Sequence, residues 1–319
     1  MRYRELGTLS VSEVGLGSWL TIGRDRQQRV DALVRAALDL GVNLFDTADS
    51  YDGAQEALGG ALRGVPRDDY VISTKVYYPY PGGSGGLSRD HILSSARRSL
   101  RQLGVDHLDL LSAHRFDDSV PLPETIGAFA ELVAAGAIRH YGVSEWTAAQ
   151  ISEACRVAEE IGAPRPVSNQ PQYNVVWRVP EGEVVPTCQR FGLGLVAFWP
   201  LAQGILTGKY RPGRPAPAQS RGATDLGRQT MSALMHDAVL DRVELLGRLA
   251  ARRGLTTAQL AIAWVLNRPG VRAAVVGASG PEQLTENVGG SGVRLDGTTM
   301  ALVDKVLTGL VHTDVTATG

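Results

Sequence analysis

Short apolar runs alternate with longer amphipathic stretches from Val14 onward, and this alternation limits the fold more than any other feature of the chain. Each run is continuously apolar, which indicates strands buried on both faces, as in a parallel sheet. Eight such units predict an α/β fold of the (β/α)₈ TIM-barrel class. The predicted strands are Val14–Gly17, Asn43–Asp46, Val71–Lys75, Leu108–Ala113, His140–Val143, Val167–Gln170, Gly194–Phe198 and Ala273–Val276.

Helices are predicted between these strands from apolar residues at helical spacing and from helix-end signals. One stripe comprises Val30, Leu33, Val34, Ala37 and Leu38, and another comprises Val239, Val243, Leu246 and Ala250; we expect both to face the barrel wall. Ser88 and Thr256 are predicted N-caps for helices over Arg89–Leu103 and Thr257–Leu266, while Gly41, Gly104 and Gly254 follow predicted helix ends.

A single domain accounts for all 319 residues, since barrels of this class reach that length with one core. Tyr3–Leu9 and Val11–Val14 predict an N-terminal β-hairpin that closes the barrel floor. Segments rich in glycine and proline predict long loops at about 77–87 and 208–230, placed where such barrels build their active sites. The end, about 312–319, is predicted to be loose.

Charge and segment composition exclude several classes of protein. Lysine and arginine total 32 against 33 acidic residues, so the near-neutral net charge does not indicate binding to nucleic acid or to an anionic membrane. The N-terminus lacks the pattern of a signal peptide and no run of eighteen apolar residues occurs, so we expect a cytoplasmic protein without membrane insertion. Cys155 and Cys188 lack metal-ligand spacing, predicting free buried thiols and no metal site.

Potentially reactive residues fall at the carboxyl ends of different predicted strands, which converge on one mouth in such a barrel. Asp46, Lys75, His114, Ser144 and Gln170 all occupy this position, and Tyr51 follows in the loop after Asp46. Taken singly, each has a structural interpretation, such as a helix cap for Asp46 or a solvated strand end for Lys75. Together they indicate a proton-donating site.

Several longer blocks resemble the aldo-keto reductase superfamily, in the branch that includes potassium-channel β-subunit reductases and their bacterial relatives. DTADSYDGAQEALG (Asp46–Gly59) is similar to the family signature, although Asp52 stands where many relatives have glycine, and some channel-type relatives have asparagine where His114 falls. The other blocks are STK (Ser73–Lys75), LDLLSAHR (Leu108–Arg115), GVSEW (Gly142–Trp146), SNQPQYN (Ser168–Asn174), WPLAQGILTGKY (Trp199–Tyr210) and GASGPEQLTEN (Gly277–Asn287).

The resemblance implies reduction of aldehydes or ketones with a catalytic set of Asp46, Tyr51, Lys75 and His114. Tyr51 would donate the proton, and a cation beside its oxygen would stabilise the phenolate, since a free phenol titrates near pH 10. Lys75 would supply that charge and Asp46 would hold it, while His114 would orient the substrate carbonyl.

The chain lacks the GxGxxG pattern of a Rossmann domain, and the resemblance implies instead an NADPH cofactor that lies extended across the barrel mouth. Lys209 and Arg221 match phosphate-clamping positions, and two fixed cations favour the extra 2′-phosphate of NADPH. Arg221 could instead be a solvated loop arginine, and Glu286 and Asn287 could be helix-surface residues. The implied cofactor residues are Ser18, Trp19, Asp46, Ser144, Glu145, Gln170, Phe198, Trp199, Pro200, Leu201, Ala202, Gln203, Lys209, Arg221, Gly277, Ser279, Gln283, Glu286 and Asn287.

Three functions remain open at this point. The first is a reductase acting on a small-molecule carbonyl substrate, whose pocket Trp19, Tyr77, Tyr78, Trp146 and Trp177 could wall if they are not simply packed. The second is a cofactor-binding regulatory or channel-accessory subunit. The third, a metal- or phosphate-sugar-dependent barrel enzyme, is opposed by the missing metal-ligand cluster. The resemblance leaves a homo-oligomer open, since relatives include both assemblies and monomers.

Overall fold

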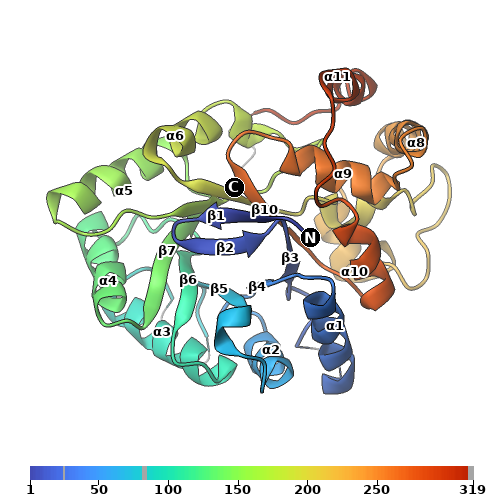
Figure 1. The fold of residues 1–319 in the computed structure, drawn as a ribbon. Coiled ribbons are helices and arrows are strands. Elements are labelled where there is room, and N and C mark those ends of the chain that lie inside the picture. Colours follow the sequence, from blue (N-terminus) through green and yellow to red (C-terminus); the bar gives the residue numbers. More distant parts are fainter. Residues whose placement is uncertain (24–25, 81–84, 315–319) are drawn as a thin grey trace.

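Eight parallel strands close into a barrel in the computed structural model, which describes residues 1–23, 26–80 and 85–314 (Figure 1). In order around the barrel they are β10 (Val271–Val276), β3 (Val14–Gly17), β4 (Leu44–Asp46), β5 (Val71–Val76), β6 (Leu108–Ala113), β7 (Ile138–Ser144), β8 (Ser168–Gln170) and β9 (Gly194–Phe198). The predicted TIM-barrel class is confirmed, and all eight predicted strands are present with boundaries shifted by two residues or fewer.

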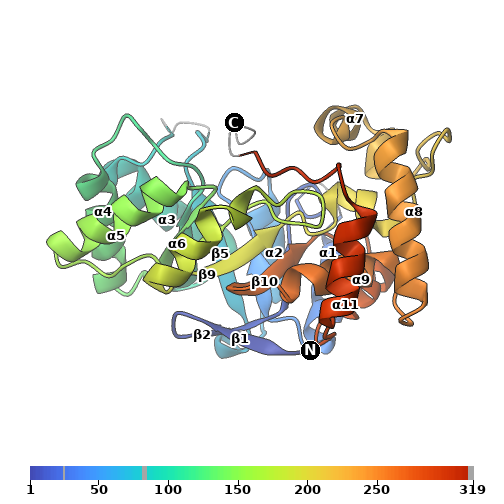
Figure 2. The same ribbon diagram turned by 90° about the horizontal axis from the view of Figure 1, so that it is seen from above.

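A ring of helices surrounds the barrel (Figures 1 and 2). The first six follow their strands singly: α1 (Gln27–Asp39), α2 (Ala54–Leu62), α3 (Arg89–Leu103), α4 (Leu122–Ala134), α5 (Ala148–Glu160) and α6 (Val184–Phe191). Three follow β9, namely α7 (Asp225–Met231), α8 (Asp237–Ala251) and α9 (Thr257–Leu266), and two follow β10, namely α10 (Pro281–Val288) and α11 (Gly297–Val306). Short 3₁₀ turns are η1 (Arg67–Asp69), η2 (Val179–Glu181), η3 (Ala202–Thr207) and η4 (Arg221–Ala223).

Helix ends follow the predicted signals closely. The Ser88 and Thr256 side chains accept hydrogen bonds from the backbone of the first turns of α3 and α9, and Thr256 forms a reciprocal capping box with Gln259. Gly104 ends α3 in the left-handed conformation. These local signals therefore predicted the first and last residues of both helices correctly.

The prediction that the stripe of Val239, Val243, Leu246 and Ala250 faces the barrel wall is wrong; this stripe lies on α8. The α8 stripe packs against α9, η3 and α11, and α9 is the helix that packs on strand β10. The reason lies in α9, whose sequence TAQLAIAWVL is buried on almost every side, so one face lies on the barrel and α8 covers another. Figure 2 shows α8 outside α9 accordingly.

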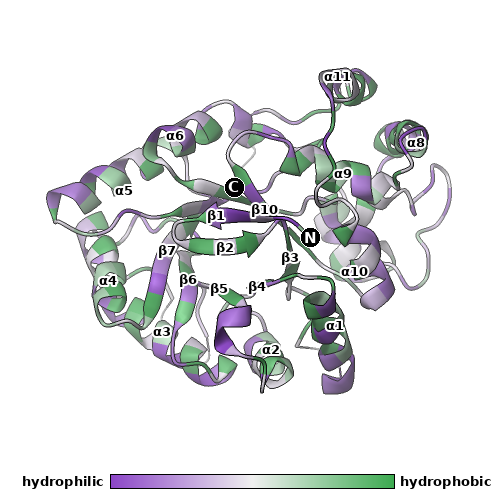
Figure 3. Cartoon of the chain, viewed as in Figure 1, coloured by the Kyte–Doolittle hydropathy of each residue, from purple (hydrophilic) through white to green (hydrophobic). Residues whose placement is uncertain are grey.

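The N-terminal hairpin, β1 (Tyr3–Leu6) and β2 (Leu9–Ser12), closes the floor of the barrel as predicted. Leu6, Leu9 and Val11 form one buried cluster with barrel residues such as Leu44 and Leu110. Figure 3 shows β1 as mainly hydrophilic and β2 as mainly hydrophobic. The hairpin turn lies earlier than predicted, with Gly7 adopting a φ of +62° directly after Leu6.

Two predicted irregular segments contain more order than expected. The segment 208–230 includes η4 and α7, where the Thr224 side chain caps α7 by accepting from the Gly227 amide. His312 pairs its backbone with Val176 and Arg178 and stacks on Trp177, so the loose end does not begin there. The remainder of that predicted end, 315–319, and part of the loop at 77–87, 81–84, lie outside the described residues.

Candidate functional site

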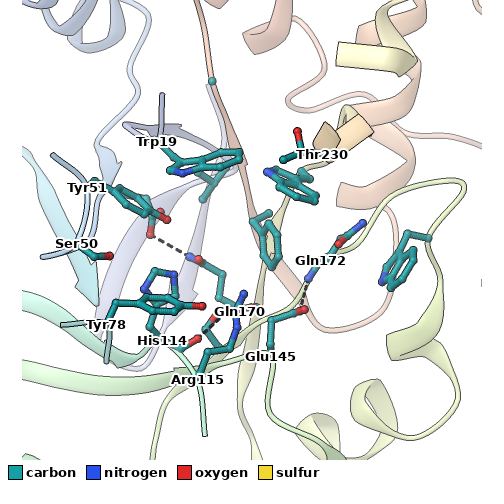
Figure 4. Close-up of a pocket in the computed structure, with 18 of the residues that line it drawn as sticks. Trp19, Ser50, Tyr51, Tyr78, His114, Arg115, Glu145, Gln170, Gln172 and Thr230 are labelled. Atoms are coloured by element: carbon teal, nitrogen blue, oxygen red, sulfur yellow. Dashed lines mark hydrogen bonds between the residues drawn. The ribbon is translucent and has the colours of Figure 1, made fainter. Parts of the chain in front are cut away.

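The carboxyl ends of the barrel strands open into a cavity of about 720 Å³. This is the end of the barrel opposite the hairpin floor, and strand-end side chains from several strands meet there (Figure 4). The residues of the predicted set that line the cavity are Trp19, Asp46, Tyr51, His114, Ser144, Glu145, Gln170, Phe198, Trp199, Arg221 and Gly277. Sequence residues scattered over more than 250 positions therefore share one site.

A buried ion pair joins Asp46, which lines the cavity, to Lys75, which lies behind it and does not line the cavity. Lys75 on β5 is 1% exposed and its Nζ donates to Asp46 Oδ2 at 2.6 Å and to the Thr47 carbonyl at 2.9 Å. Ser73 Oγ and Gln170 Nε2 both donate to the other carboxylate oxygen of Asp46 at 3.0 Å. Both charges are thus held by several charge-assisted hydrogen bonds, as buried ions require.

Tyr51 lies beside this pair, in the loop between β4 and α2. The Lys75 ammonium is 5.6 Å from the centre of the Tyr51 ring. Burial and the Asp46 carboxylate raise the pKa of Tyr51, and Arg115 opposes them. The phenol therefore carries its proton at neutral pH, as a proton donor must.

His114 follows β6 and faces the Tyr51 ring edge to face, with 5.9 Å between ring centres. Burial, the Lys75 ammonium and the Arg115 guanidinium lower its pKa well below the usual range. Its imidazole is therefore neutral near pH 7, and its Nδ1 has no hydrogen-bond partner among the described residues. A neutral imidazole can donate one hydrogen bond into the cavity.

Ser144 and Gln170 end adjacent strands β7 and β8. Ser144 Oγ donates to the Gln170 carbonyl at 2.9 Å, and the Gln170 side chain reaches Asp46. Glu145 comes next, and its Oε1 accepts from the Gln172 amide at 2.6 Å. Burial raises the pKa of Glu145, opposed by that hydrogen bond and by Arg115. These side chains join three strand ends into one polar wall.

Aromatic rings and an arginine form the opposite wall. Trp19 and Trp199 lie with ring centres 5.7 Å apart, and the Arg221 guanidinium is 5.2 Å from the centre of the Trp19 ring. Arg221 lines the cavity, so the structure does not leave it as a solvated loop arginine. Ser18 Oγ nearby is buried and has no hydrogen-bond partner among the described residues.

The backbone is strained where the predicted cofactor residues lie. Positive φ values for residues other than glycine are rare and concentrate at functional sites. In the described part of the chain they occur at Leu20, Glu145, Trp199, Ala202 and Gln203, of which all but Leu20 belong to the predicted cofactor set.

The remaining predicted cofactor residues flank the cavity. Pro200, Leu201, Ala202 and Gln203 form the turn from β9 into η3, and Gln203 hydrogen-bonds Thr230 of α7. Lys209 is exposed and its ammonium lies over Gly204. None of these five residues is in the cavity lining itself, and Gln203 is joined to it through Thr230.

Ser279 lies just before α10, and its amide and hydroxyl both donate to Gln283 Oε1 on that helix, at 2.7 and 3.0 Å. Asn287 is 1% exposed and directs its amide toward the Gly277 carbonyl, so the helix-surface interpretation of Asn287 is wrong. Glu286 is exposed, as a helix-surface residue would be. Among these residues, Gly277 alone lines the cavity.

Sequence reasoning missed four polar cavity residues, Ser50, Arg115, Gln172 and Thr230. Three of them adjoin or lie close to predicted residues in the chain, and that proximity at a strand end was the available signal. Thr230 gave no signal because only the return of α7 over the mouth brings it there. Of the five aromatic candidates, Trp19, Tyr78 and Trp177 line the cavity, whereas Tyr77 and Trp146 do not.

Cys155 and Cys188 are free and buried, as predicted. Within residues 1–23, 26–80 and 85–314, no group of three or more His, Cys, Asp or Glu side chains could hold a metal ion. In the same described part of the chain, no helix combines the length and apolarity needed to cross a bilayer.

Comparisons with known proteins agree with this architecture. The model of the aldo/keto reductase family matches residues 13–308. Over 300 residues the chain is 39% identical to a probable voltage-gated potassium channel subunit beta of Oryza sativa subsp. japonica, covering 90% of each protein. It is 35% identical over 302 residues to an L-glyceraldehyde 3-phosphate reductase of Escherichia coli O157:H7, covering 90% of this chain and 87% of that protein. The chain therefore belongs to the aldo/keto reductase family, whose members are oxidoreductases that use NAD(P)H.

Proposed function

We propose that the protein reduces aldehydes or ketones to alcohols with NADPH, and that Tyr51 is the proton donor. The observation that carries this proposal is the placement of two neutral groups, the Tyr51 phenol and the His114 imidazole, on one cavity wall with the buried Lys75–Asp46 pair beside them. Carbonyl reduction requires a proton delivered to the oxygen that gains negative charge, and this wall can deliver it.

The residues around the mouth fit a nicotinamide dinucleotide. Trp19 and Trp199 offer flat apolar faces, and the buried Ser18 hydroxyl lacks a partner among the described residues. Arg221 and Lys209 supply cations, while the turn from Gly277 into α10 supplies amides at a helix N-terminus. Two such cations favour the additional phosphate of NADPH.

When bound, the cofactor supplies the hydride that reduces the carbonyl carbon. The chain supplies the rest of the reaction. His114 orients the carbonyl oxygen by a hydrogen bond, and Tyr51 Oη donates its proton to that oxygen as negative charge develops there. Lys75 then stabilises the phenolate electrostatically, and Asp46, held by Ser73 and Gln170, keeps the ammonium in position.

A second function is favoured by the names of relatives. Proteins described as potassium channel β-subunits are 38–39% identical to this chain over most of its length. A channel-accessory subunit would bind NADPH and transmit its presence to a partner, with weak reductase activity. The intact set of Asp46, Tyr51, Lys75 and His114 supports the reductase as the main function.

The test is a turnover assay with purified protein, NADPH or NADH, and a panel of aromatic aldehydes and ketones, followed by loss of cofactor absorbance. Wild type, Tyr51→Phe and Tyr78→Phe are compared, because Tyr78 also lines the cavity and lies 5.0 Å from the His114 ring. We expect turnover with NADPH in wild type and Tyr78→Phe only. Tight NADPH binding without turnover on any compound would favour the accessory function instead.

A further inference from the structure

Arg115 follows His114 directly, and its side chain lines the same cavity. Nη1 donates to the His114 carbonyl at 2.6 Å, which turns the guanidinium back beside the end of β6. In Figure 4 it lies between the Tyr51 and His114 side and the Glu145 and Gln172 side. A guanidinium has five N–H donors, and only one of these has a protein acceptor among the described residues.

Several half-buried or buried arginines in the described part of the chain are paired with carboxylates, whereas Arg98, Arg221 and Arg242 are half-buried and form no such pair. Arg4 pairs with Glu13, Arg67 with Asp109 and Arg178 with Asp304, at 2.5 to 2.6 Å. Arg115 forms no such pair with any described carboxylate, although it is half-buried. Withdrawing a cation from water without an anionic partner is unfavourable. Arg115 differs from Arg98 and Arg242 in lining the cavity, where a ligand can supply the anion.

The charged groups facing Arg115 leave it available to a ligand. Two carboxylates line the cavity with Arg115. Asp46 is held by Lys75, and Glu145 Oε1 already accepts from the Gln172 amide. Burial also raises the pKa of Glu145, which reduces its negative charge near neutral pH. Arg115 meanwhile opposes the increase in the pKa of Tyr51 and adds to the decrease in the pKa of His114, so its positive charge reaches the groups proposed to act on the carbonyl.

We propose that Arg115 binds an anionic group of the substrate, a carboxylate or a phosphate, a few bonds from the carbonyl that is reduced. This inference rests on the proposed function and assigns its substrate class. The planar guanidinium can hold either anion by two parallel hydrogen bonds. Because Arg115 adjoins His114, such a bond would fix the carbonyl oxygen near His114 and Tyr51.

The kinetic test compares charged and neutral aldehydes of the same shape. We would measure kcat/KM with NADPH for 4-carboxybenzaldehyde against methyl 4-formylbenzoate, and for 4-formylphenyl phosphate against 4-methoxybenzaldehyde. The two pairs separate carboxylate from phosphate recognition. In wild type we expect a preference for at least one anion, arising mainly in KM.

Arg115→Gln should lower that preference ratio at least tenfold, whereas Arg115→Lys should keep part of it because it keeps the charge. Arg139→Gln removes the same charge at the exposed start of β7, far from the cavity, and should leave the ratio unchanged. The ratio is the readout because Arg115 also acts on Tyr51, so some loss common to both members of a pair is expected.

A binding test separates this inference from the proposed reaction. Tryptophan fluorescence, reported by Trp19, Trp177 and Trp199 in the cavity wall, would give the Kd of each aldehyde for the protein with NADP⁺. An anionic aldehyde that binds more tightly than its neutral partner, and that loses this advantage in Arg115→Gln, supports the inference even if no compound is reduced. In that case only the reductase proposal fails. A wild type that binds the charged and neutral members equally, or an Arg115→Gln variant that weakens both equally, overturns it.

Discussion

Replacing Asp49 by asparagine should stabilise the protein at neutral pH and much less at acidic pH. Asp49 lies two residues before Tyr51 and is 3% exposed. Ser95 Oγ donates to its Oδ2 at 2.5 Å, but its Oδ1 is buried without a hydrogen-bond partner among the described residues. Asparagine has nearly the same shape, and its carbonyl oxygen can still accept from Ser95.

The expected magnitude follows from the pKa of Asp49. Burial raises this pKa from 3.8 to about 6, although Ser95 and Arg98 oppose the increase. A raised pKa in the folded state means that stability is greatest below pH 3.8 and falls as pH rises through about 6. A pKa shift of this size lowers the free energy of unfolding by roughly 3 kcal/mol over the whole titration. About 2 kcal/mol of that loss occurs between pH 4.5 and 7.5.

Urea denaturation followed by tryptophan fluorescence at pH 4.5 and 7.5 would measure this effect. The difference in unfolding free energy between Asp49→Asn and wild type should be about 2 kcal/mol more favourable to the variant at pH 7.5 than at pH 4.5. Asp52→Asn makes the same change at an exposed neighbouring position and serves as the control. An equal effect of Asp49→Asn at both pH values would refute the reasoning.

Three further predictions concern other parts of the molecule. Lys75→Met should lower the free energy of unfolding measured in urea by about 3 kcal/mol, because the Asp46 carboxylate stays buried without its partner. The double variant Lys75→Met, Asp46→Asn should lose less stability than the sum of the two single variants. Arg221→Met should raise the Kd for NADPH by tenfold or more in a fluorescence titration with little change for NADH; equal losses would contradict its assignment to the additional phosphate. Leu6→Ala should cost about 2–5 kcal/mol of stability by opening the floor cluster, with kcat/KM unchanged because the cavity lies at the other end.

The barrel could be predicted from the sequence because most of its strands correspond to continuous apolar runs. The start of β7 was missed, since Ile138 is followed by the exposed Arg139 and the apolar run begins only after His140. Helix α7 was missed because DLGRQTM shows no apolar stripe and depends on the Thr224 cap and on packing. Contacts of this kind arise only once the chain has folded.

The part of the candidate site that lies at the carboxyl ends of strands, or just after them, could be predicted from the sequence. Asp46, Tyr51 and His114 reach the same cavity because parallel strands place their carboxyl ends together. The unpaired state of Arg115 could not be predicted, because it depends on which carboxylates the folded chain leaves out of reach. The burial of Asp49 likewise follows from the packing of the Tyr51 loop on α3.

The central claim, that Tyr51 delivers the proton, is tested most directly by single-turnover kinetics. Protein saturated with NADPH would be mixed rapidly with a reducible aldehyde, and cofactor oxidation followed for wild type, Tyr51→Phe and Tyr78→Phe. General acid catalysis contributes about 10²–10⁴-fold, so Tyr51→Phe should be slower by that factor with an unchanged Kd for NADPH. Oxidation in Tyr51→Phe at the rate of wild type would contradict the claim.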